Sequence, residues 1–156
     1  MSGFLTRGWQ VSRVLAAKVC ATELDITSST TFVTVTGCTH KLLGGKTYII
    51  EAHITGTAGA SGGAKATLAG DGILSAAFFT LTGTNRNNAT TNAASSTTTL
   101  GNAVAGATAV MTDIILLGAI AVNAPGTISL QLAQNASNGT ATSAYVGSYL
   151  KLTPVD

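Results

Sequence analysis

The clearest pattern in the chain is a strict alternation of apolar and polar residues between positions 127 and 132. Ile128, Leu130 and Leu132 alternate there with threonine, serine and glutamine. A strand points successive side chains to opposite faces of its sheet, so the pattern predicts a strand with one buried face and one wet face.

The run just before it is apolar on both faces. Ile114, Leu116, Ile120 and Val122 share one face, and the other face carries Ile115, Leu117, Ala119 and Ala121. Asn-Ala-Pro-Gly at 123–126 predicts a turn, so we expect the two runs to form an antiparallel hairpin within Asp113–Gln134. One face of the first run would cover the core. The second face needs another partner, and we predict that it packs on a neighbouring copy of the chain.

The remaining alternation is typical of a β protein. A second strong strand is expected at 46–55, where Tyr48, Ile50, Ala52 and Ile54 share a face. Weaker strands are expected at 23–27, 31–36, 65–68, 75–81 and 143–152, and 13–20 suits a strand or a short helix. The polar stretch Gly83–Thr99 predicts a long exposed loop. The fold class is therefore expected to be all-β: an antiparallel β-sandwich, jelly-roll-like, of about eight strands.

Composition narrows the class of protein. The 156 residues suit a single domain at 14–156 behind a short arm at 1–13. Charged residues make up only 9% of the chain, against about 25% in ordinary domains, which suits a packed assembly. The net charge of +2 is too small to predict a nucleic-acid partner. Apolar runs are too short for a membrane span, and without a secretory signal pattern we expect a cytoplasmic origin.

The first thirteen residues differ from the rest, because they hold the only tryptophan and two basic residues but no acid. Aromatic and arginine side chains are enriched at binding hot spots, and arginine binds carboxylates through two hydrogen bonds. We therefore predict that the arm attaches the domain to a larger partner. The anchors would be Phe4, Leu5, Arg7, Trp9, Val11 and Arg13. The alternative is that the arm folds over its own domain as a lid.

No residue pattern predicts catalysis. His40, His53, Glu51 and Asp25 could bind metal, but their spacing fits no known ligand set. The serines lack a G-x-S-x-G elbow, paired carboxylates with glycosidase spacing are missing, and the glycine-rich stretch at 58–63 lacks a phosphate-loop ending. We expect no enzyme activity, no metal and no cofactor. The two cysteines, at 20 and 38, are expected to be reduced, with a disulfide as the alternative.

Several segments together resemble a known group of proteins. GKTYIIEAHI, a middle rich in alanine, threonine and serine, ILLGAIAVNAPGTISLQLAQN and a terminal GSYLKLTPV resemble small β-sandwich virion proteins of tailed phages. The resemblance covers about Thr31 to Val155 and leaves the arm outside. It implies a non-enzymatic virion protein, assembled in the host cytoplasm, that forms a homotrimer or larger oligomer.

Two virion roles fit the resemblance. The first is a capsid decoration, or cement, protein that binds the major capsid protein between capsomers. The second is a tail-fibre, spike or receptor-binding subunit, whose partners would be tail proteins or a host receptor. Only 5% of the residues are aromatic, which favours the capsid role because sugar-binding faces need exposed rings.

Overall fold

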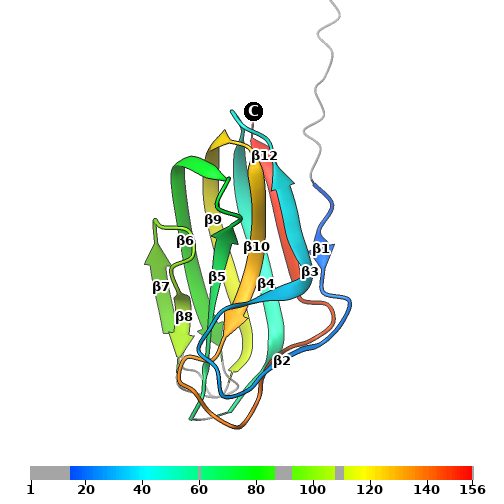
Figure 1. Cartoon of the computed structure of the whole chain (residues 1–156), viewed down its shortest axis with the longest axis vertical. Coiled ribbons are helices and arrows are strands. Elements are labelled where there is room, and N and C mark those ends of the chain that lie inside the picture. Colours follow the sequence, from blue (N-terminus) through cyan, green and yellow to red (C-terminus); the bar gives the residue numbers. More distant parts are fainter. Residues whose placement is uncertain (1–14, 60, 87–92, 108–110, 156) are drawn as a thin grey trace, which may run out of the picture.

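The fold consists of two antiparallel β-sheets packed face to face (Figure 1). The computed structural model describes residues 15–59, 61–86, 93–107 and 111–155. All regular elements in these ranges are strands, which confirms the predicted all-β sandwich. No helix in these ranges is long and apolar enough to cross a membrane.

The larger sheet has eight strands among the described residues. Its main path runs through β1 (Lys18–Val19), β12 (Tyr149–Val155), β4 (Thr47–Ala58), β9 (Met111–Ala124), β6 (Ser75–Arg86) and β7 (Ala93–Thr97). Near the end of β4, β11 (Thr142–Ala144) also pairs with it, and β2 (Leu24–Ile26) pairs with β11. The smaller sheet follows the order β3 (Val33–Leu42), β10 (Gly126–Ala133), β5 (Ala64–Gly70) and β8 (Val104–Ala107).

The core lies between the sheets and is built from the predicted inward faces. On β4, the four even-numbered residues from Tyr48 to Ile54 are buried, as their alternation predicts. Ile128, Leu130 and Leu132 of β10 are also buried, and they belong to the same hydrophobic cluster as the inward side chains of β9. The alternation therefore identified the buried side of each strand correctly.

The predicted hairpin is wrong, although both of its strands exist. In the structure, β9 pairs with β4 and β6 in the larger sheet, whereas β10 pairs with β3 and β5 in the smaller one. The chain crosses between the sheets at Pro125, which lacks an N–H and so donates no ladder hydrogen bond. Both strands carry a buried apolar face, and in opposite sheets these two faces cover each other across the core.

The predicted loop Gly83–Thr99 is also wrong in large part. Residues 83–86 complete β6, and Ala93–Thr97 forms β7, which pairs with β6 along the sheet edge. The edge strand consists of alanine, serine and one threonine, so its ladder with β6 forms without bulky apolar residues. Asn85 is buried, and its side-chain N–H donates to the Ala105 carbonyl at 3.2 Å. Residues 87–92 lie outside the described residues.

Three strand boundaries also differ from the prediction. The expected strand at 143–152 is divided into β11 and β12 by a turn in which Gly147 has a φ of +96°. The stretch 13–20 contributes only the short β1 among its described residues. In contrast, the strand expected at 31–36 continues to Leu42 through Gly37, whose φ is +88°.

Candidate interaction surfaces

The four residues predicted to contact a neighbouring copy lie on the face of β9 that points away from the core. We call Ile115, Leu117, Ala119 and Ala121 the β9 strip. Leu117 is 55% exposed, and the other three side chains are partly buried. No described element of the chain forms a third layer over this face.

Neighbouring strands widen this apolar surface. Ile49 of β4 pairs with Ala119, and Phe78 of β6 pairs with Ala121. Val155 of β12 lies in the same row as Phe78, two strands beyond β9. These three side chains are each about half exposed. We define the outer-face patch as the β9 strip together with Ile49, Phe78 and Val155.

The other half of the same face is polar, and it contains an ion pair between Glu51 and Lys151. Glu51 accepts a hydrogen bond from the Tyr149 hydroxyl at 2.8 Å and another from the Lys151 ammonium at 3.1 Å. The Tyr149 hydroxyl and then Lys151 lower the pKa of the Glu51 carboxyl, since both stabilise its charged form. His53 Nε2 lies 3.5 Å from Asp113 Oδ1, and both atoms are buried.

The outer face of the smaller sheet has a different character. Thr39 and Ser129 share a hydrogen bond of 3.0 Å between their hydroxyls, and the Gln131 amide donates to the Thr34 hydroxyl at 3.4 Å. These side chains occupy the outward positions of β3 and β10, where the alternation predicts a wet face. The sandwich therefore has one polar outer face and one that is apolar over half its length.

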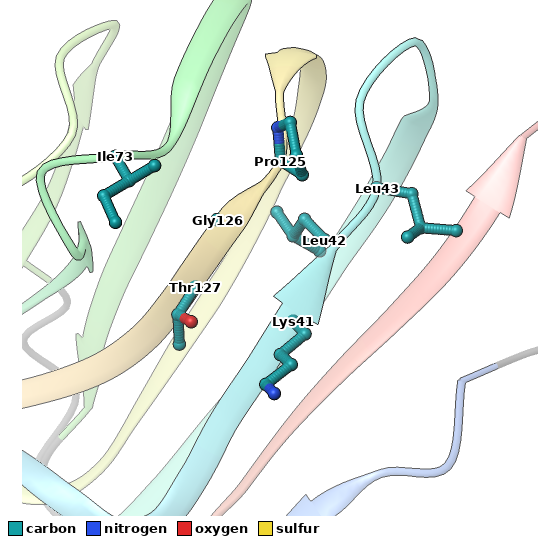
Figure 2. Close-up of a pocket in the computed structure, with 7 residues that line it drawn as sticks. All are labelled: Lys41, Leu42, Leu43, Ile73, Pro125, Gly126 and Thr127. Atoms are coloured by element: carbon teal, nitrogen blue, oxygen red, sulfur yellow. The ribbon is translucent and has the colours of Figure 1, made fainter.

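A second apolar surface lies at one end of the sandwich. It is an open groove of about 330 Å³ lined by Lys41, Leu42, Leu43, Ile73, Pro125, Gly126 and Thr127. In Figure 2, Ile73 and Leu43 lie on opposite sides of Leu42 and Pro125. Leu43 is 64% exposed and Ile73 is 73% exposed, so two large apolar side chains project into solvent at this end.

The turn that carries Ile73 is held by Asp71. Its carboxylate accepts hydrogen bonds from the backbone N–H groups of Ile73 at 3.0 Å, Leu74 at 2.9 Å and Thr127 at 2.8 Å. The pKa of Asp71 is lowered, most strongly by the bond from Leu74. Asp-Gly is a typical turn sequence, but nothing in the sequence predicted the groove, because single apolar residues in separate loops carry no periodic signal.

The six predicted arm anchors lie at residues 1–13, outside the described residues, so their attachment role stays a prediction. The entry point of the arm is nevertheless defined. The Leu15 N–H donates to the Leu152 carbonyl at 3.1 Å, and β1 runs antiparallel to β12. Traced from β1 back to Leu15, the chain runs along β12 towards Val155. Val155 pairs with Thr47, which comes just after the loop that carries Leu43. The first described residues therefore run along β12 towards the groove end of the sandwich (Figure 1).

The candidate metal ligands do not converge. His40 is buried and its Nε2 donates to the Leu150 carbonyl at 3.1 Å, while His53 lies on the opposite side of the larger sheet with Glu51. Asp25 accepts a hydrogen bond from the Ser143 hydroxyl on the edge strands. No group of three or more histidine, cysteine, aspartate or glutamate side chains in the described ranges could hold a metal ion.

Both cysteines are free thiols buried between the sheets, as the sequence led us to expect. Burial, followed by the nearby Cys20 thiol, raises the pKa of Cys38 to about 11. A thiol with so high a pKa is protonated near neutral pH and is a poor nucleophile. The pair therefore contributes to the core.

No family model, curated protein or solved structure matches this chain. The resemblance to phage virion proteins accordingly stays a prediction from the sequence. The two surfaces described above, the outer-face patch and the end groove, are the features from which a function can be argued.

Proposed function

We propose that this protein is a non-enzymatic structural component of a phage virion, a capsid decoration protein that binds the major capsid protein. One observation supports the proposal: the exposed apolar groove lies at the end of the sandwich towards which Leu15, the first described residue, extends along β12. Leu43 and Ile73 project from that end, and Leu15 follows β12 towards it. The groove and the arm together would form one attachment surface.

The energetics favour a composite surface over the groove alone. Full burial of a leucine or isoleucine side chain contributes about 1.5–3 kcal/mol, so burying the exposed parts of Leu43 and Ile73 contributes somewhat less. Association costs about 4–15 kcal/mol in lost translational and rotational freedom. Two side chains cannot offset that cost. The aromatic and arginine residues of the arm supply the additional contacts that the attachment needs.

A co-sedimentation assay with shells that lack the protein tests this role. Removal of residues 1–12 should abolish sedimentation, and Leu43→Ser and Ile73→Ser should each weaken it, while all three variants remain folded by circular dichroism. Val146→Ser is the matched control, because Val146 is 64% exposed like Leu43 but lies in the turn after β11, near Thr55. That variant should sediment like the wild type.

Two results would contradict the proposal. If the truncated chain and both groove variants sediment as strongly as the full chain, the groove end is not the attachment surface. Quantifying the copies per virion tests the location separately. Hundreds of copies fit a capsid lattice, whereas a few to some tens of copies would assign the protein to the tail.

A further inference from the structure

We infer that a second copy of this chain covers the outer face of the larger sheet, with the outer-face patch at the centre of the contact. The inference goes beyond the proposed virion role, because it rests only on the sheet and would hold wherever the protein functions. It enlarges the β9 strip to a surface that spans four strands, β12, β4, β9 and β6.

The size of the face suits a stable interface. From β12 to β6 the sheet has four neighbouring strands, which at a spacing of about 4.8 Å gives a width of roughly 19 Å. Along β9, the distance from Asp113 to Ala121 is roughly 27 Å at about 3.4 Å per residue. The product, roughly 520 Å², is about two thirds of the ~800 Å² that each partner contributes to a standard protein interface, so the face can form the main part of one.

The composition of the face also suits an interface. Ile49, Phe78 and Leu117 are large apolar side chains that stay about half exposed although they lie on regular strands. Contiguous apolar patches on monomeric proteins are small, and larger ones mark interaction sites. Ala119 and Ala121 lie among them, and their small side chains would let another protein surface approach the sheet closely.

The distribution of charge favours an identical chain as the partner. Beside the patch, Glu51 is paired with Lys151, and the Asp113 carboxylate lies next to the His53 ring. An identical face therefore brings the Glu51–Lys151 pair as a neutral unit, and like-charge contacts are the main electrostatic obstacle to association. The apolar half would form the centre of the contact and the paired charges its polar rim, which is the usual anatomy of an interface.

The arrangement of copies has a consequence for the groove. Homo-oligomers are usually closed by rotation about an axis. When that axis lies along the strands, every copy presents its groove end in the same direction. Several attachment surfaces would then bind one larger partner together, and linked sites bind far more tightly than single ones.

Light scattering after size-exclusion chromatography of the full chain at micromolar concentration tests the inference. The wild type should have a mass of at least twice the chain mass of 15.5 kDa, and three times that value for the trimer. Leu117→Lys and Phe78→Lys should each weaken association at least about 30-fold, as expected for central interface residues. Val146→Lys is the control, since it adds the same charge at an exposed apolar residue outside the patch, and it should keep the wild-type mass.

Further variants keep the test decisive. Thr82→Lys places a charge beside Leu117 at an exposed position of β6, so it should dissociate the oligomer even if a charge at Leu117 itself prevents folding. Truncation of residues 1–12 should leave the number of chains in the oligomer unchanged. A wild-type mass of one chain would overturn the inference, as would Leu117→Lys and Thr82→Lys proteins of wild-type mass. If the wild type is monomeric and truncation exposes an apolar surface to a fluorescent dye, the arm covers the face instead.

Discussion

At Gly118 the backbone of β6 lies too close to β9 to leave room for a side chain. Gly118 pairs with Leu81 of β6 and with Ile50 of β4, in the middle of the larger sheet. A Cβ atom at Gly118 would lie 2.1 Å from the Thr80 carbonyl oxygen and 3.1 Å from the Leu81 Cα. Ordinary contacts begin near 3.4 Å, so Gly118→Ala requires the backbone to move by more than an ångström.

The cost of that movement can be worked out. Inserting a methyl group into a packed region typically costs about 1–3 kcal/mol, and contact with backbone lies at the upper end because it cannot rotate away. Replacing glycine by alanine also restricts the unfolded chain, which returns about 0.4–1 kcal/mol. The net loss is about 2 kcal/mol. In a domain of this size that lowers the Tm by about 4–8 °C.

Thermal unfolding followed by circular dichroism measures the effect, with all samples at one protein concentration because association also shifts the Tm. Gly139→Ala is the matched control. A Cβ at Gly139 meets no atom within 4 Å, so its Tm should stay within about 2 °C of the wild type. A Gly118→Ala protein that melts at or above the wild-type temperature would refute the close pairing of β6 and β9.

Three other predictions follow from buried polar groups. Burial lowers the pKa of His40 below its usual 6.5, so the unfolded chain binds the proton more readily than the folded chain. The free energy of unfolding should therefore fall as the pH drops below about 6.5. His40→Gln should flatten this pH dependence in urea titrations. Both cysteines are buried, and burial raises the pKa of Cys38 to about 11. A thiol reagent at about pH 8 should therefore modify neither cysteine until the protein unfolds. Rapid labelling of native protein would contradict this. Asn85→Ala leaves the buried Ala105 carbonyl without its side-chain donor and should cost about 1–3 kcal/mol by urea unfolding.

The candidate surfaces were only partly accessible from the sequence. The apolar character of the outward face of β9 could be predicted, because apolar residues occupy both the odd and the even positions of this strand. Its extension across the sheet could not, since Ile49, Phe78 and Val155 are distant in the chain and meet the β9 strip only through strand pairing. The groove was missed for the same reason, because Leu43 and Ile73 belong to different loops.

The order of apolar and polar residues was enough to predict which residues of β4, β9 and β10 face the core. The inward residues of β4, β9 and β10 follow from a period of two, which is a local property of an extended chain. Local alternation does not specify which sheet a strand joins, so β9 and β10 looked like a hairpin and β7 looked like a loop. Those pairings depend on contacts between residues that are far apart in the chain. The apolar faces of β9 and β10 are covered when they oppose each other across the core, and the alanine- and serine-rich edge is stable as a strand because β6 supplies its hydrogen bonds.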